Sequence, residues 1–409
     1  MQKRQQKWIS QERIHRLQPC RLLLAAVLLT GFVSSGCGAQ DAAGKTEGQR
    51  EDLIAHSLVS TGNTHRISRV FEKAAAGEDI TIAYVGGSIT EGYAVGARAP
   101  ECYASLSAAE FETAYCSGGT VTCQNDGFAA TPSIIGNLQA ADTVLPSEPD
   151  IILIEYAVND GQNEIYQSAY ESLVRTCLEA PNEPAVILLF TWMETGHTCQ
   201  DQQQAIGEYY DLGMISVRDA IAAEIESGAM QWSEYGADDV HPSAAGHRLL
   251  ADMLANYFAS AKAKKPEKDY ALPADSLHEN LYLNAKICDA SNTLYRDGSW
   301  EAGSHSNVFR AGFVYQKDQG NEPLVMDLTG RSLFIIYKKY SDPDWGLAGI
   351  YVNGSLAGVV SANQPGRWGE PAVDLIETYD SVQDLHVEIR MLDDQTDKSF
   401  EILALGVSE

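Results

Sequence analysis

Three groups with catalytic potential stand far apart in this sequence: a serine, an asparagine and an aspartate–histidine pair. Ser88 follows a β-branched run and two glycines, Asn159 follows another apolar run, and Asp238 precedes His241 by three positions. A serine hydroxyl is a weak nucleophile until a neighbouring base takes its proton, and histidine suits that task near neutral pH. Because Asp238 can hold the second ring nitrogen of His241, these residues predict nucleophilic attack by Ser88 on a carbonyl carbon.

Such an attack creates an oxyanion, which needs hydrogen-bond donors. The candidate donors are the backbone N–H of Ser88, the backbone N–H of Ala130 and the side-chain amide of Asn159. Taken alone, each motif has an ordinary explanation, since Asp-x-x-His is often a helix cap with a surface histidine and Gly-Gly-Ser is often a plain turn. The prediction therefore depends on all of them meeting in one place.

Alternating strands and helices provide that place. Because loops that follow parallel strands emerge at one edge of a sheet, Ser88 and His241 can meet although more than 150 positions separate them. The pattern predicts a parallel sheet covered by helices on both faces. Its expected strands are 80–85, 119–123, 150–155, 185–190 and 214–217, and its last helix is expected over 243–261.

The pattern changes after Asp269, where short alternating apolar runs and turn signals such as Asn353-Gly354 begin. Many short strands with turns between them predict a β-sandwich. We therefore expect an α/β domain over 53–265 and an accessory β-sandwich domain over 275–409. The three tryptophans of the second domain could form a sugar-binding platform or pack in its core; they are Trp300, Trp345 and Trp368.

The amino terminus resembles an export signal. A basic region precedes the apolar stretch Leu22–Val33, which is too short to span a bilayer but fits the core of a signal peptide. The small residues that follow end in Cys37, as in bacterial lipoprotein signals, so 1–37 is expected to be a signal peptide and Cys37 to be lipidated. Residues 38–52 would form a flexible tether. The protein would then be a bacterial cell-surface lipoprotein, held to the membrane only by its lipid; ordinary secretion or an uncleaved anchor is the alternative.

The charge of the chain limits the classes of partner that it can bind, and its cysteines bear on disulfide formation. The formal net charge is −27, and it is more negative without the basic signal. Such a surface repels nucleic acid and anionic lipid headgroups, which favours a neutral substrate. Export permits disulfides, but the pairing of the six cysteines after Cys37 is not determined by their spacing.

Together, the stretches around Ser88, Asn125–Thr131, Asn159 and Asp238–His241 resemble the four blocks of the SGNH (GDSL-type) hydrolases. The resemblance covers about residues 65–262. It implies a flavodoxin-like three-layer α/β/α fold and ester hydrolysis through an acyl-serine, without metal or cofactor. It also assigns the nucleophile to Ser88, the base to His241 and the orienting acid to Asp238, with Ser88, Ala130 and Asn159 as oxyanion donors.

The sequence departs from this family at two places, where alanine replaces a glycine: Ala130 and Ala157. If position 130 requires a positive φ, alanine is strained there and activity is expected to be weaker.

An exported chain with an acidic surface, an appended β-sandwich and no long apolar lid predicts an esterase that removes acetyl groups from a carbohydrate. Another small neutral ester is a further possible substrate. Two alternatives remain at this stage: a lipase or O-acyltransferase that uses the same residues, and a non-catalytic carbohydrate-binding surface lipoprotein.

Overall fold

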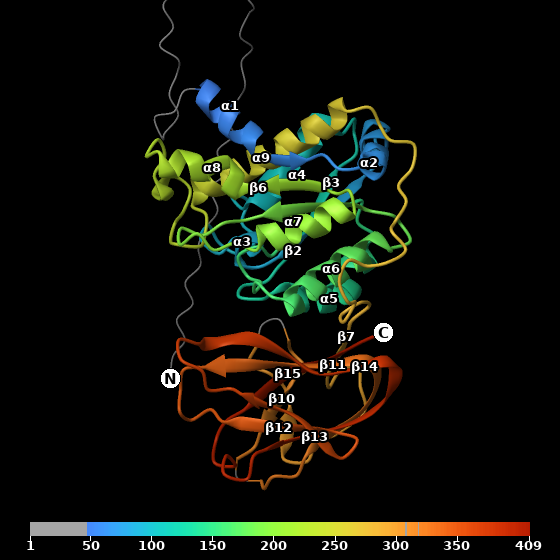
Figure 1. Ribbon diagram of the computed structural model, residues 1–409, viewed down its shortest axis with the longest axis vertical. Helices are drawn as coiled ribbons and strands as arrows, with labels where there is room; N and C mark the ends of the chain where they lie inside the picture. Colours follow the sequence, from blue (N-terminus) through green and yellow to red (C-terminus); the bar gives the residue numbers. More distant parts are fainter. Residues whose placement is uncertain (1–46, 307–308, 318) are drawn as a thin grey trace, which may run out of the picture.

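The computed structural model describes residues 47–306, 309–317 and 319–409, which form an α/β domain followed by a β domain (Figure 1). The predicted signal peptide, Cys37 and most of the predicted tether lie outside the described residues. Among the residues described, no helix has both the length and the apolar character needed to cross a membrane.

The first domain contains a six-stranded sheet with the order β1-β6-β5-β4-β2-β3. Strands β2 to β6 are parallel, and the short β1 is antiparallel to β6. The strands are β1 (Leu58–Ser60), β2 (Ile80–Gly86), β3 (Val121–Gly127), β4 (Ile151–Glu155), β5 (Ala185–Phe190) and β6 (Gly213–Ser216). This sheet confirms the predicted parallel α/β fold.

Helices cover both faces of the sheet, because successive side chains of a strand point to opposite faces. Ile82 and Tyr84 pack with α2 (His65–Ala75), α4 (Tyr103–Tyr115), α8 (Val217–Glu226) and α9 (Ala244–Ala263). Ala83 and Val85 pack with α6 (Glu164–Leu178), α7 (Gln200–Tyr209) and the turn η1 (Ala140–Val144). The result is the expected three-layer arrangement. The other short elements are α3 (Ser88–Glu91), α5 (Ser133–Gln139), η2 (Leu145–Ser147) and η3 (Trp232–Glu234).

The predicted tether extends too far at its carboxyl end. Residues 47–52 belong to the helix α1 (Glu47–His56), which packs beside α8 and α9. Leu53 is buried in the core, and Arg50 forms an ion pair with Asp252 of α9. These contacts fix α1 to the domain, so the folded part begins before residue 53.

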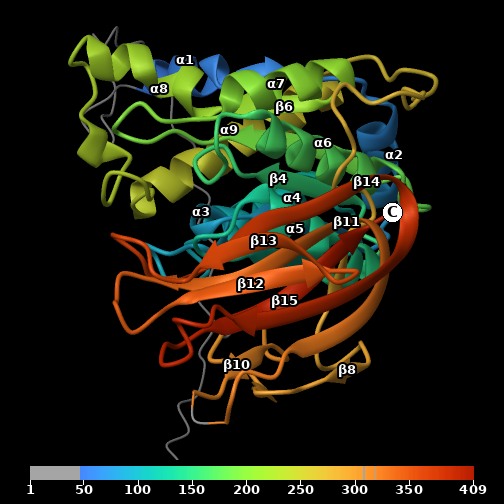
Figure 2. The same cartoon turned by 60° about the horizontal axis from the view of Figure 1, so that its bottom comes forward.

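The second domain is a nine-stranded antiparallel sheet that folds into two layers (Figures 1 and 2). Its strands are β7 (Lys286–Cys288), β8 (Tyr295–Arg296), β9 (Trp300–Ala302), β10 (Phe313–Tyr315), β11 (Leu324–Tyr340), β12 (Leu347–Val352), β13 (Ser355–Ser361), β14 (Trp368–Met391) and β15 (Glu401–Ser408). Two short apolar runs of the sequence, 324–328 and 332–337, are halves of the single strand β11.

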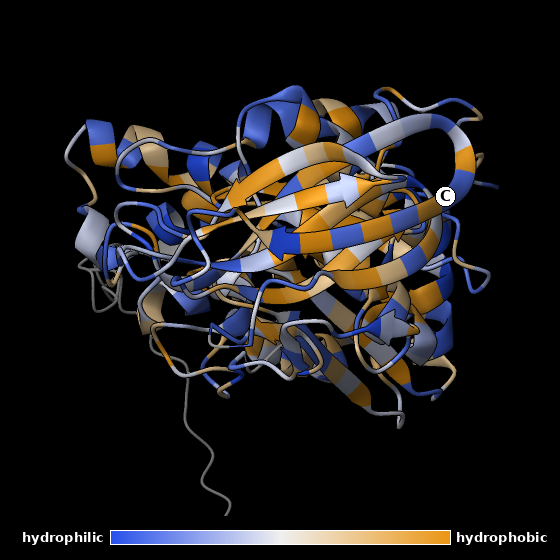
Figure 3. Cartoon of the chain, turned by 90° about the horizontal axis from the view of Figure 1, so that it is seen from below, coloured by the Kyte–Doolittle hydropathy of each residue, from blue (hydrophilic) through white to orange (hydrophobic). Residues whose placement is uncertain are grey.

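A register shift between Gly330 and Ser332 divides β11. Before it, Met326 and Leu328 face the core between the layers, and after it Leu333 and Ile335 do so. Such an irregularity bends a strand and changes which residues point inward. Figure 3 shows hydrophobic and hydrophilic residues alternating along several strands of this domain. The predicted β-sandwich is therefore made largely by one sheet that bends over itself.

The two domains share an apolar interface. On the outer face of the second half of β11, Phe334 and Ile336 pack against Ile135 and Leu138 of α5. The linker, which joins α9 to the second domain, is also held in place. Arg175 of α6 donates hydrogen bonds to the carbonyls of Pro273, Ala274 and Asp275. Glu171 of α6 accepts hydrogen bonds from the backbone N–H groups of Leu277 and His278. The second domain is thus docked on α5 and α6.

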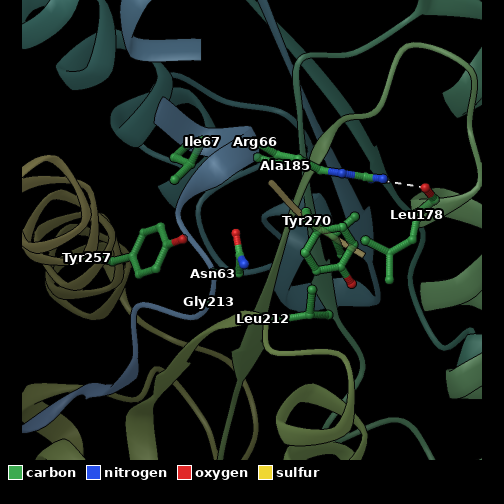
Figure 4. Close-up of a pocket in the computed structure, with 10 residues that line it drawn as sticks. Asn63, Arg66, Ile67, Leu178, Ala185, Leu212, Gly213, Tyr257 and Tyr270 are labelled. Carbon is green, nitrogen blue, oxygen red and sulfur yellow. Dashed lines mark hydrogen bonds between the residues drawn. The ribbon is translucent and has the colours of Figure 1, made fainter. Parts of the chain in front are cut away.

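The linker also closes a small pocket at the amino ends of the strands. Figure 4 shows Tyr270 of the linker beside Arg66, whose guanidinium donates to the carbonyl of Leu178 at 3.0 Å. The pocket is lined by Ala185 and Gly213, which begin β5 and β6. It therefore lies at the sheet edge opposite the carboxyl end of β2, where Ser88 stands.

Candidate active site

The turn that carries Ser88 requires glycine for reasons of space. A Cβ atom on Gly86 would lie 2.2 Å from Oγ1 of Thr90, and one on Gly87 would lie 2.3 Å from Oδ1 of Asn159. Neither glycine has a positive φ. The glycines therefore leave room for the side chains of Thr90 and Asn159. Ser88 begins the single helical turn α3 just after β2.

Ser88, His241 and Asp238 form one hydrogen-bonded chain. Nε2 of His241 lies 2.8 Å from Oγ of Ser88, and Nδ1 lies 2.8 Å from Oδ2 of Asp238. A carboxylate only accepts hydrogen bonds, so Nδ1 donates to Asp238 and Nε2 is left to accept the proton of Ser88. The neighbouring Asp239 instead offers its backbone carbonyl to the N–H of Glu194. The geometry is that of a serine nucleophile with an oriented base.

The turn before α9 keeps Asp238 charged. Partial burial acts to raise the pKa of Asp238, but hydrogen bonds from the backbone N–H and ring of His241 and from the N–H of Val240 outweigh it and lower that pKa. The indole N–H of Trp232 donates to the carbonyl of Asp238 at 2.6 Å. A carboxylate that stays ionised stabilises an imidazolium on the facing ring.

Ala130 lies in the left-handed region, with φ of +58°. Contacts on both sides hold its loop: the N–H of Ala129 donates to Glu91, and the N–H of Ser133 donates to Asp160. A left-handed conformation costs an L-residue about 1–2 kcal/mol. The glycine at this place in the SGNH pattern thus has a physical reason, and Ala130 keeps its N–H at the cost of strain. Ala157, by contrast, is not among the residues with positive φ and is fully buried.

Asn159 and Ala130 line one open pocket of about 370 Å³ between the two domains, which we call the interdomain pocket. The first domain contributes Ala130, Pro132, Val158, Asn159 and Tyr166, and the second contributes Lys339, Arg367, Trp368, Glu370, Pro371, Ala372, Val373 and Asp374. The close approach of Asn159 to Gly87 places this pocket beside the Ser88 turn. Two of the three residues predicted to supply oxyanion donors therefore line a space that a substrate can enter.

Comparison with known proteins agrees with this geometry. Residues 84–249 match the model of the GDSL-like lipase/acylhydrolase family. The first domain is therefore similar to this family over most of its length. The matched range contains Ser88, Ala130, Asn159, Asp238 and His241.

Two solved structures resemble the chain over both domains. One is a two-domain esterase (CEX) active on acetylated mannans, co-crystallised with mannopentaose; it is 26% identical, with a TM-score of 0.78, and the match covers 87% of this chain and 98% of that one. The other is a structure of a two-domain esterase of the same description, at 25% identity and a TM-score of 0.79, with the same coverage. No curated protein matches the chain. The protein is a carboxylic ester hydrolase with a two-domain architecture.

A buried carboxylate supports the Ser88 turn of the first domain. Glu155, at the end of β4, accepts hydrogen bonds from the hydroxyls of Thr90 at 2.9 Å and Thr191 at 2.6 Å. Backbone N–H groups of Gly87 and Thr90 also donate to it. Burial raises the pKa of Glu155 to about 7, although these hydrogen bonds act to lower it. Burial likewise raises the pKa of Asp160 to about 7.

Two residues of the candidate site, Glu155 and Tyr93, were not singled out from the sequence. Glu155 carried a signal, since a glutamate that ends a wholly apolar strand has to find buried donors. Tyr93, whose ring lies against that of His241 at an inclination of 33°, carried none. Of the three tryptophans considered for sugar binding, only Trp368 lines the interdomain pocket; Trp300 is buried in the core, and Trp345 stacks on Tyr340.

The six cysteines of the two described domains are all unpaired thiols. They are Cys102, Cys116, Cys123, Cys177, Cys199 and Cys288. Within the described ranges, no group of three or more His, Cys, Asp or Glu side chains is arranged to hold a metal ion.

Proposed function

We propose that the protein is an extracytoplasmic serine esterase that removes acetyl groups from a carbohydrate, through an acyl-serine on Ser88. The observation that carries this proposal is the Ser88–His241–Asp238 hydrogen-bonded chain beside a pocket shared by both domains. The resemblance of the whole chain to an esterase active on acetylated mannans supports the carbohydrate substrate. An acetylated mannan is the first substrate to test.

The chemistry follows from the hydrogen-bond directions. His241 takes the proton of Ser88 as Oγ attacks the acetyl carbonyl, and Asp238 stabilises the imidazolium that forms. The N–H groups of Ser88 and Ala130 and the amide of Asn159 receive the oxyanion. His241 then gives its proton to the leaving sugar hydroxyl. A water molecule, deprotonated by His241, releases acetate from the acyl-serine in the second half of the reaction.

The second domain supplies the means to hold a sugar chain. Trp368 is 66% exposed, and its ring offers an apolar face next to polar groups in the interdomain pocket. Arg367 pairs with Glu370 at 3.0 Å, so these charges balance within the wall. A flat aromatic surface with balanced charges suits a neutral carbohydrate better than an anionic one.

The proposed location depends on residues outside those described. Cys37 would carry the lipid that holds the enzyme at the bacterial cell surface, where acetylated polysaccharides are met. Replacement of Cys37 by alanine should release the protein from the membrane fraction. Labelling with a radioactive fatty acid in the producing cell measures the lipid directly, and an unlabelled, soluble wild-type chain would contradict the anchor.

The activity is tested with Ser88→Ala, measured as acetate released from acetylated mannan and as hydrolysis of p-nitrophenyl acetate. We expect losses on the order of 10⁴-fold or more on both substrates. Ser227→Ala is the matched control, because Ser227 is exposed at the end of α8. A fluorophosphonate should label Ser88 in the wild type; absence of that adduct, or wild-type activity of Ser88→Ala, would refute the mechanism. Faster release from long-chain esters than from acetate would favour a lipase.

A further inference from the structure

Tyr93 stands over the proposed base with most of its side chain in solvent. Its ring centroid is 4.4 Å from that of His241, and the two ring planes are inclined by 33°. The residue is nevertheless 61% exposed. Burial of apolar surface therefore does not account for an aromatic residue at this position.

The backbone holds Tyr93 where it is. Its N–H donates to the carbonyl of Ser88 at 3.0 Å, so the turn that presents the nucleophile also presents the aromatic ring. Gly92, with φ of +91°, redirects the chain between them. A Cβ atom on Gly92 would lie 2.9 Å from the carbonyl oxygen of Gly96, so the turn is tight as well as left-handed. Ser88 and Tyr93 consequently contact the same imidazole from one short segment.

The other restraint on His241 is incomplete. The side chain of Asp238 is 45% exposed, and water competes there for the carboxylate. The titratable groups around His241 are Asp238 and Asp239 on its own turn, Tyr93, and His247 of α9; Glu194, in the loop after β5, contacts this turn through its backbone N–H, which donates to the carbonyl of Asp239. Burial lowers the pKa of His247 to about 4, so His247 is neutral at physiological pH.

We propose that Tyr93 is a positioning residue for the acid–base step: its ring face holds the imidazole of His241 in line with Ser88 and stabilises the imidazolium formed during acyl transfer. The proposal rests on the proposed function, since it needs His241 to accept and return the proton. An aromatic face within about 6 Å of a cation attracts it through the ring quadrupole. This attraction acts only once the imidazole of His241 becomes charged, so it favours the transition state over the ground state.

The test compares Tyr93→Phe, which keeps the ring, with Tyr93→Leu, which keeps bulk without the ring. The substrate is p-nitrophenyl acetate, which has no sugar for Tyr93 to contact. We expect Tyr93→Phe to stay within twofold of the wild type. For Tyr93→Leu we expect kcat to fall about two- to fivefold, with KM little changed. Tyr295→Leu, a half-exposed tyrosine of the second domain, is the matched control.

The pH profile of kcat/KM separates this role from a structural one. Without the ring face the imidazolium is less stable, so the neutral base persists to lower pH. The acidic limb of the Tyr93→Leu profile should therefore move about half a pH unit toward acid, whereas that of Tyr93→Phe should not move. An unmoved limb in Tyr93→Leu, a loss carried by KM, or equal losses in both variants would overturn the proposal.

Fluorophosphonate labelling of Ser88 distinguishes the role of Tyr93 from the proposed function. A Ser88 adduct in the wild type together with normal kinetics of Tyr93→Leu would contradict only the role of Tyr93. Absence of the adduct in the wild type would contradict the proposed function itself.

Discussion

The interdomain pocket has one wall from each domain, and the two walls differ in how their side chains are held. On the α/β side, Asn159 and Ala130 lie in short loops at strand ends, which hydrogen bonds to buried groups hold in place. On the β side, Trp368 stands at the start of a long strand with most of its ring in solvent. The first wall is preorganised, whereas the exposed ring of Trp368 in the second is free to adapt.

This difference matches what the proposed function requires of each wall. Stabilising an oxyanion needs donors that are already in place when charge develops, because reorganisation during the reaction would cost activation free energy. Holding a polymer needs contact area and tolerance of its shape. We therefore expect changes in the α/β wall to affect every ester equally, and changes in the β wall to affect polysaccharides alone.

The largest effect is expected from Asn159→Ala, which removes a proposed oxyanion donor. Its kcat should fall about 10²- to 10³-fold, by the same factor on p-nitrophenyl acetate and on acetylated mannan. Asn182→Ala is the control, because the amide of Asn182 donates to the carbonyl of Pro149, outside the interdomain pocket. A loss confined to the polysaccharide would break the comparison of the two walls.

The next largest effect is expected from Glu155→Gln, which tests the buried carboxyl group that supports the Ser88 turn. The pKa of Glu155 is about 7 in the folded chain against 4.5 as its ordinary value, so the folded state binds more protons between these two pH values. Its contribution to stability is thus fully present below pH 4.5 and is lost as pH rises to about 7, by roughly 3 kcal/mol.

The measurement is the free energy of unfolding from urea titrations at several pH values. The wild type should lose stability over this range, and Glu155→Gln should lose less, keeping the slope that comes from Asp160. Parallel curves for the two proteins would mean that Glu155 does not carry the effect.

Trp368→Ala tests the β wall. Loss of the exposed ring should lower kcat/KM about tenfold on acetylated mannan oligosaccharides, the size of one aromatic contact. Hydrolysis of p-nitrophenyl acetate should be unchanged. Leu294→Ala, also exposed in the second domain, is the control and should be silent on both substrates. An equal loss on the small ester would mean that Trp368 acts on the catalytic groups instead.

The smallest effect is expected from Ala130→Gly. Glycine removes the left-handed strain of about 1–2 kcal/mol but adds unfolded-chain entropy worth about 0.4–1 kcal/mol. The free energy of unfolding should therefore rise by about 0.5–1 kcal/mol. Ala129→Gly is the matched control, since Ala129 has no positive φ and should lose stability. Destabilisation by both changes would show that position 130 is not strained.

Much of the site could be predicted because its parts are local. A buried strand that ends in Gly86-Gly87-Ser88 specifies its own turn, and Asp238 reaches His241 within four residues. The parallel sheet could also be predicted, since apolar runs alternate with helical patterns. Because the loops that follow parallel strands emerge at one edge of such a sheet, Ser88 could be expected near His241.

Other features depend on packing between distant segments. The strained Ala130 lies in a loop that is held on either side by distant residues, Glu91 and Asp160. The bend of β11 depends on two layers closing over one core while Phe334 and Ile336 pack against α5.

What the amino-acid order alone determined was the set of proposed reacting groups and the type of sheet that presents them, because short-range patterns encode both. Only the tertiary structure decided which aromatic rings lie at the candidate site, Tyr93 beside His241 and Trp368 in the pocket that Asn159 also lines. A tryptophan looks the same in sequence whether it fills a core or faces a pocket. The difference lies in the surfaces that the rest of the chain leaves uncovered.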